Sequence, residues 1–224
     1  MIDEKVLAAL ARYDSPTLSN AIETFDVRNR DEGYTSHEIH CLSPDLPTVV
    51  GLAATVAVRS HEPPLNPLEP ARLWKHVQSV AGPRILVAQD LDDPNGSGAM
   101  WGEVQATIFK ALGCLAIATD GVVRDLSEVR AMGIQLYAAG ITVSHAYAHF
   151  ESAGHGVSIG GLVVRPGDLL HADRHGILLI PAEIADKVPA AADKIIATEQ
   201  KLIGWIRSDD FDPKRLDEMR RVEH

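Results

Sequence analysis

The feature that most limits the fold of this chain is the alternation of apolar runs and glycine turns between Asp90 and Glu128. An apolar run over residues 84–89 ends at a glycine-rich loop, which leads into a helical pattern that ends near Gly113. A second apolar run, residues 114–119, ends in a loop that carries Arg124 and Asp125. This order predicts parallel strands, and parallel sheets bind ligands at the loops that follow their strands. The two loops are therefore expected to lie side by side.

The rest of the chain favours one α/β domain with a mixed sheet. Residues 26–47 form a long unperiodic segment, interpreted either as a lid or interface or as a plain connection. Residues 143–156 are rich in His, Tyr and Gly and predict irregular structure. We expect a single domain over residues 1–207 and a tail over 208–224. Helices are predicted over 3–13, 16–25, 71–80, 125–132 and 182–206, and strands over 49–58, 84–89, 114–119, 134–138 and several short runs from 157 to 181.

Composition restricts the class of protein. The formal net charge is −10 and no basic block stands out, which argues against nucleic acid as the main partner. No apolar run approaches the ~18 residues of a membrane span. Acidic residues near the N-terminus do not fit a signal peptide, so a cytoplasmic protein is expected. Of the two cysteines, Cys114 stands in an apolar run and is interpreted as a reduced core residue.

The first loop has the chemistry of an anion site. It leads into a helix whose first N–H groups lack intrahelical acceptors and whose positive dipole end favours carboxylate or phosphate. Gly96, Gly98 and Gly102 would let the backbone approach a ligand closely. Val104, Ile108 and Leu112 are expected to form the apolar face of the helix. The alternative is a flexible turn with no ligand.

The second loop places a cation beside an anion. Asp125 and Glu128 fit a capping box for the helix that follows, which explains Asp125 without any function. Arg124 could equally be a surface ion-pair partner. A third acid, Asp120, stands close by. Carboxylates are hard oxygen ligands suited to Mg²⁺ or Mn²⁺, and a guanidinium suits an enolate or carboxylate oxygen.

Twenty positions separate Glu103 from the Arg124-Asp125 pair. This spacing resembles the signature of the class II pyruvate aldolases related to 4-hydroxy-4-methyl-2-oxoglutarate aldolase, a superfamily that also contains the ribonuclease regulator RraA. Further blocks of the chain resemble the same family in the same order: TLSNAIE, VVGLAATV, GCLAIATDGVVRD and GGLVVRPGDLLHADRHGILLIP. The resemblance implies a single-domain α-β-β-α sandwich of the swivelling (phosphohistidine-like) type, assembled into homotrimers or dimers of trimers with active sites between subunits.

The resemblance also implies residue roles. Arg124 would bind the keto oxygen of a small 2-oxo acid, and Asp125 would be the direct ligand of a divalent cation, usually Mg²⁺, with Mn²⁺ as another choice. Glu103, and also Glu199 from a neighbouring subunit, would hold the cation through water; an exposed helical acid is the alternative for Glu199. The substrate would be bound by the backbone N–H groups of four consecutive residues: Gly102, Glu103, Val104 and Gln105.

The function that follows is a metal-dependent carbon–carbon lyase, which cleaves a 4-hydroxy-2-oxo acid by retro-aldol reaction or decarboxylates oxaloacetate through a pyruvate enolate. The alternative is a regulator in the manner of RraA, which binds a ribonuclease without chemistry of its own. The stretch SHAYAHFESAGHG differs from the Pro-rich segment that the family would place there. Its His145 and His149 are interpreted as substrate-recognition or interface residues in preference to a second metal site.

Overall fold

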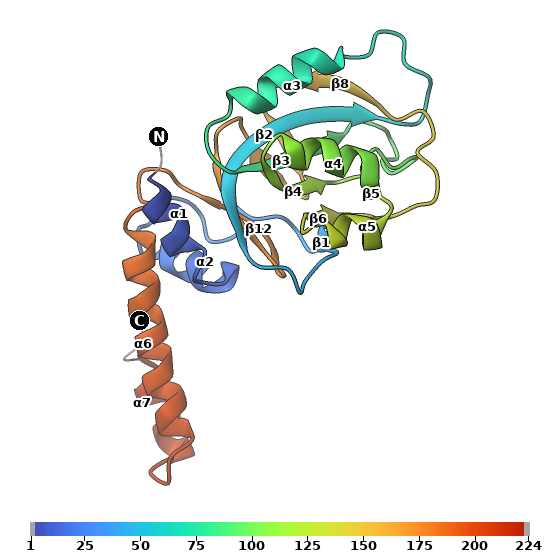
Figure 1. The fold of residues 1–224 in the computed structure, drawn as a ribbon. Helices are drawn as coiled ribbons and strands as arrows, with labels where there is room; N and C mark the ends of the chain where they lie inside the picture. Colours follow the sequence, from blue (N-terminus) through green and yellow to red (C-terminus); the bar gives the residue numbers. More distant parts are fainter. Residues whose placement is uncertain (1–2, 222–224) are drawn as a thin grey trace.

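A computed structural model describes residues 3–221, so residues 1–2 of the predicted domain and 222–224 of the predicted tail lie outside the described residues. Three helices cover one face of the central sheet, while two N-terminal helices pack against a long C-terminal one (Figure 1). The α-helices are α1 (Glu4–Leu10), α2 (Ser15–Glu23), α3 (Pro70–Ser79), α4 (Glu103–Ala111), α5 (Leu126–Ala131), α6 (Val188–Ile206) and α7 (Leu216–Arg221), with a 3₁₀ turn at Pro213–Arg215.

The sheet is mixed, as the sequence predicts. Its strand order is β1-β6-β4-β3-β2-β11-β12, and β8 also pairs with β2. The strands β2, β3, β4 and β6 are parallel, whereas β1, β8, β11 and β12 pair antiparallel. The strands are β1 (His40–Cys41), β2 (Val49–Arg59), β3 (Arg84–Asp90), β4 (Cys114–Thr119), β5 (Val122–Val123), β6 (Gln135–Ala138), β7 (Gly140–Ile141), β8 (His149–Ala153), β9 (Val157–Ile159), β10 (Leu162–Val164), β11 (Leu169–Asp173) and β12 (Gly176–Ile180).

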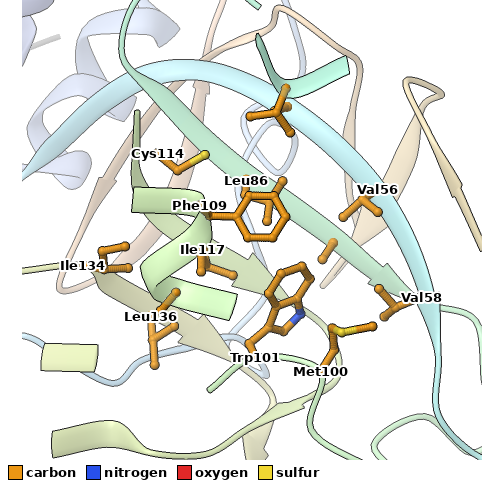
Figure 2. Packing of buried hydrophobic residues seen from close by; sticks show 14 of the residues in the cluster. Val56, Val58, Leu86, Met100, Trp101, Phe109, Cys114, Ile117, Ile134 and Leu136 are labelled. Carbon is orange, nitrogen blue, oxygen red and sulfur yellow. The ribbon is translucent and has the colours of Figure 1, made fainter. Parts of the chain in front are cut away.

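Alternate residues of the central strands serve two different cores. On β3, Leu86 belongs to the core beneath α3, α4 and α5, while Ile85 and Val87 belong to the core on the opposite face, where β9 and β10 pack. Figure 2 shows Trp101 and Phe109 in the first core, next to Leu86. Their rings meet edge to face with centroids 5.4 Å apart. This packing fixes the chain directly before Gly102, where the two loops of interest meet.

Several local predictions are wrong in their details. Residues 149–153, predicted to be irregular, form β8, because β2 offers them an antiparallel partner whose register shifts between Ala57 and Val58. The last long helix begins at Val188 and not at residue 182. The helix α2 begins at Ser15, one residue before its predicted start, and is capped by the side chain of Asp14. Val104 is 71% exposed, so it is not part of the apolar face of α4.

The helix α6 runs away from the body that carries α4 and α5 (Figure 1). Glu199 lies on this helix, in a groove that α6 forms with α2. Within one chain it therefore does not join Arg124 and Asp125, and its role at a neighbouring subunit's site stays a prediction. Over the described residues 3–221, no helix has the length and apolar character needed to cross a membrane.

Candidate active site

A cavity of about 190 Å³ lies where the loop before α4 meets the loop before α5. The isolated bridge between Trp101 and Val123 joins the two loops, and the Arg124 N–H donates to the Trp101 carbonyl at 2.9 Å. These backbone contacts bring Arg124 and Asp125 beside the first turn of α4, as the parallel-strand prediction requires. The residues that line the cavity are Ala99, Met100, Gly102, Val104, Gln105, Arg124, Asp125, His145 and Ala148.

The carboxylate of Asp125 caps a helix other than its own. Asp125 is the N-cap residue of α5 but gives that helix no side-chain cap hydrogen bond, so the predicted capping box is wrong. Its backbone adopts the left-handed conformation (φ 55°, ψ 42°), which turns the side chain toward α4. There Oδ2 accepts the N–H of Glu103 at 3.0 Å. The local pattern of acids suggested a cap, but only the tertiary structure decides which helix receives it.

Gly102 is required by the close approach of these loops. A Cβ atom at this position would lie 2.5 Å from Asp125 Oδ2, shorter than the contacts that real Cβ atoms make, and 3.0 Å from Arg124 Cγ, tighter than most of them. Its φ of −149° is ordinary extended backbone, so the constraint comes from space and not from conformation. Gly102 thus allows the guanidinium and the carboxylate to sit directly against the start of α4.

Arg124 and Asp125 present opposite charges to the same small space. Arg124 Nε lies 3.6 Å from Asp125 Oδ2, and both side chains are a little over one third exposed. Such a partly exposed pair contributes little stability by itself, about 0–1 kcal/mol. Its value is that both charged groups remain accessible to an occupant of the cavity. The guanidinium can bind an oxyanion while the carboxylate can bind a cation.

The start of α4 offers fewer free donors than the sequence suggested. The N–H of Glu103 already donates to Asp125, while those of Val104 and Gln105 belong to the first turn, which has no acceptor within the helix. Both residues line the cavity. The side chain of Glu103 is exposed, and Glu103 is not among the lining residues. The two N–H groups of Val104 and Gln105 are therefore the candidate anion donors.

The donor set fits a hydrated divalent cation. Among residues 3–221, no three His, Cys, Asp or Glu side chains come together as a metal cluster. One carboxylate, that of Asp125, is available at the cavity, and Mg²⁺ commonly binds through one or two carboxylates while keeping several waters. Gln105 also has a buried amide oxygen without a hydrogen-bond partner in the described part of the chain. An unpaired acceptor of this kind favours an occupant that brings a donor.

Asp120, the third acid of the sequence prediction, holds the glycine loop and does not line this cavity. Its Oδ1 accepts the N–H of Asp90 at 2.7 Å, while Asp90 Oδ2 accepts the N–H of Gly96 at 2.8 Å. The amide of Asn95 donates to the Asp120 carbonyl at 2.7 Å. Burial raises the pKa of the Asp120 carboxyl to about 6, against a smaller opposing effect from its hydrogen bond to Asp90. This pair of acids therefore orders residues 90–96 ahead of α4.

Replacing Asp120 with Asn is expected to change how stability depends on pH. The folded-state pKa of Asp120 is raised from 3.8 to about 6, so the folded protein binds this proton more tightly than the unfolded chain. The resulting stabilisation is fully present below about pH 4 and is lost as the pH rises through about 6. Urea unfolding at a series of pH values from about 4 to about 7 should show this decline in the wild type and a smaller one in Asp120→Asn. Parallel curves for the two proteins would contradict the assignment.

Sequence reasoning placed His145 in a recognition or interface segment but did not place it in this cavity. The segment 142–148 folds back over the glycine loop, and His145 enters the cavity wall from there. No spacing rule links residue 145 to residues 102–125, so only the tertiary structure could find it. His149, in contrast, lies on β8, pairs with Glu151, Nε2 to Oε1 at 2.9 Å, and lines a different cavity.

The mixed α/β fold and the two-loop site define a class of protein, and comparisons identify the family. A solved structure from Pseudomonas syringae pv. tomato aligns with 99% of this chain and 95% of its own, with a TM-score of 0.75 and 23% identity. Streptomyces coelicolor RraAS2, described as an unusual member of the RNase ES inhibitor RraA family, aligns with 89% of this chain and 96% of its own, with a TM-score of 0.70 and 24% identity. At these identities the likeness concerns the fold alone.

The chain belongs to the RraA-like family, because the family model described as Aldolase/RraA matches residues 15–179. This confirms the resemblance seen in the sequence and its fold class. A protein of Halalkalibacterium halodurans, provisionally named a 4-hydroxy-4-methyl-2-oxoglutarate aldolase, is 28% identical over 107 residues, which cover 46% of this chain and 49% of that protein. The chain spans 60%, 49% and 17% of the lengths of three curated relatives that it matches. The family thus includes proteins named as aldolases and proteins named as ribonuclease inhibitors.

Proposed function

We propose that this protein is a divalent-cation-dependent lyase that breaks a carbon–carbon bond in a small 2-oxo acid, with a pyruvate enolate as the intermediate. The observation that carries the proposal is the arrangement of Arg124 and Asp125, Nε to Oδ2 at 3.6 Å, at a cavity beside the first turn of α4. A cation, a guanidinium and free backbone N–H groups together match a ligand that carries a carboxylate next to a carbonyl.

Each group of the chain has a distinct part in this proposal. Arg124 donates to the 2-oxo oxygen and stabilises the negative charge that gathers there when the C3–C4 bond breaks. The N–H groups of Val104 and Gln105 hold the substrate carboxylate with the help of the α4 dipole. Asp125 would hold Mg²⁺ or Mn²⁺, which when bound supplies Lewis-acid polarisation of the substrate oxygens. Glu103, and Glu199 of a neighbouring copy, would hold the cation through water in a trimer or dimer of trimers.

The substitution Asp125→Asn tests the proposal at its cation site. Asn keeps an oxygen that can accept the Glu103 N–H and tolerates the left-handed backbone at this position, but it removes the negative charge. We expect wild-type protein to bind Mg²⁺ and to decarboxylate oxaloacetate, with both properties lost on chelation and both reduced by at least about tenfold in Asp125→Asn. Calorimetry with Mg²⁺ alone measures binding independently of turnover.

Chelated wild-type protein that turns over oxaloacetate at the full rate would contradict the cation requirement. The rival function is that of a binding protein that regulates a ribonuclease, as the description of the Streptomyces neighbour says of its own family. A pure adaptor has no need for an accessible guanidinium and carboxylate at one cavity. A chain that binds a ribonuclease without a cation and turns over neither oxaloacetate nor a 4-hydroxy-2-oxo acid would favour the rival.

A further inference from the structure

Among the described residues that line the cavity, His145 supplies an imidazole beside Arg124 and Asp125. The other ionisable groups in this wall, over the same residues, are a guanidinium, which remains protonated in proteins, and a carboxylate that the proposed function uses for the cation. Glu103, the acid assigned by family resemblance to hold water, does not line the cavity, whereas His145 lines it with an exposed side chain. His145 is therefore the lining residue suited to exchange a proton with an occupant.

The backbone around His145 is held in place by the glycine loop. The Ala99 N–H donates to the Ser144 carbonyl at 2.9 Å. Directly before it, Gly98 lies so close that a Cβ atom there would be 2.6 Å from the His145 carbonyl oxygen. Preorganisation of this kind is what a group that acts on a bound substrate needs, because a misplacement of about 1 Å can cost about 10²-fold in rate.

A hydrogen bond selects the tautomer of His145. Its Nδ1 lies 2.7 Å from the carbonyl oxygen of Ala146, and a carbonyl can only accept a hydrogen bond. Nδ1 must therefore carry the hydrogen. In the neutral imidazole this leaves Nε2 with a free lone pair, so that Nε2 can act as a base. The left-handed backbone of Ala146 (φ 46°) produces the turn that brings this carbonyl back to the ring.

We propose that His145 Nε2 is the base that accepts the hydroxyl proton of a 4-hydroxy-2-oxo acid, so that retro-aldol cleavage is the reaction for which this cavity is equipped. This inference rests on the proposed function. The C4–O–H proton passes to Nε2, and the oxygen lone pair forms the C4 carbonyl. The C3–C4 electron pair then moves to form the C2–C3 double bond of pyruvate enolate, with the charge on the oxygen near Arg124. Transfer of the proton from His145 to C3 completes pyruvate and restores the neutral imidazole.

Oxaloacetate provides the internal comparison, because it has no C4 hydroxyl. Its C3–C4 bond breaks with release of CO₂ and gives the same enolate without removal of a hydroxyl proton. The two reactions therefore share Arg124 and the cation site but differ in their need for a base. A defect in His145 should change the ratio of the two activities, whereas a defect in the shared groups should lower both.

The test compares kcat/KM for 4-hydroxy-4-methyl-2-oxoglutarate and for oxaloacetate in wild type, His145→Ala and His145→Gln, with pyruvate as the common readout. General-base catalysis typically contributes about 10²–10⁴-fold, so the ratio of aldol to decarboxylase activity should fall at least about tenfold in both variants. Gln can hydrogen bond but cannot take up a proton, so it should not rescue. Added imidazole should restore part of the aldol activity of His145→Ala only.

His37→Ala is the matched control, because His37 is exposed like His145 but lines a different cavity. An unchanged ratio in His145→Ala, or near wild-type cleavage by His145→Gln, would overturn the assignment of His145 while leaving the proposed function intact. Wild-type protein that acts on neither substrate would instead overturn the proposed function itself. Circular dichroism and thermal unfolding of each variant establish that its fold is retained before the ratio is read.

Discussion

Alanine in place of Arg124 should lower kcat/KM for oxaloacetate about 10²–10³-fold, the usual effect of removing one preorganised donor to a developing oxyanion. The Arg124 guanidinium lies at the cavity beside Asp125, and the Arg124 backbone is held by its N–H, which donates to the Trp101 carbonyl. The loss should appear mainly in kcat, because the charge that Arg124 stabilises develops as the bond breaks. Steady-state pyruvate or CO₂ production with saturating Mg²⁺ measures it.

Two further variants sharpen this result. Arg124→Lys keeps the charge but loses the planar fork of donors, so it should recover only part of the rate. Arg130→Ala is the control: Arg130 lies on α5, forms an exposed ion pair with Asp45 outside the cavity, and should leave turnover unchanged when it is lost. Equal effects of Arg124→Ala and Arg130→Ala would show that the guanidinium at the cavity has no special part in the reaction.

The substitution Gly102→Ala should lower the rate of turnover nearly as much as Arg124→Ala. In Gly102→Ala the new Cβ would meet Asp125 Oδ2 at 2.5 Å and Arg124 Cγ at 3.0 Å, so the Asp125 carboxylate must leave its place at the start of α4 and the Arg124 side chain must give way. A displacement of about 1 Å can cost about 10²-fold in rate. Overpacking at such a site is expected to lower the free energy of unfolding by about 1–3 kcal/mol. Kinetics and urea unfolding on the same preparation separate the two effects.

Gly204→Ala is the matched control for this substitution. Gly204 lies within α6, and nothing in the described part of the chain stands within 4 Å of the position its Cβ would take. Alanine there should stabilise the helix by up to about 1 kcal/mol and leave turnover as it is. If Gly102→Ala retained full activity and Mg²⁺ affinity, the close approach of the loops would not matter for function.

The parallel core of the fold was accessible from the sequence because its strands are continuous apolar runs between turns. The strands β2, β3, β4 and β6 and the helices α3, α4 and α5 stand close to their predicted places. The strand β8 was missed, because Phe150 is its one large apolar side chain, so it lacks the pattern of a strand and forms only by pairing with the end of β2. Its existence depends on a distant partner and not on local propensity.

The sequence predicts that Arg124 and Asp125 belong to the site, but it does not predict which groups their side chains contact. The order of strands and turns along the sequence is enough to place Arg124 and Asp125 beside Gly102, because parallel neighbouring strands end at the same edge of the sheet. The direction of the Asp125 side chain could not be predicted in this way. It depends on a left-handed backbone conformation at Asp125, which the tertiary structure imposes. The same holds for His145, which arrives from a segment that sequence spacing does not connect to the loops.

The cap that Asp125 gives to α4 has a consequence for any attempt to redesign this protein. The Asp125 carboxylate accepts the first N–H of α4, and it is also the proposed cation ligand. A substitution chosen to change cation preference would therefore also alter the positive pole that receives the substrate carboxylate. Any substitution at position 125 that removes this acceptor changes cation affinity and anion affinity together, whereas Asn removes the charge and keeps an acceptor for the Glu103 N–H.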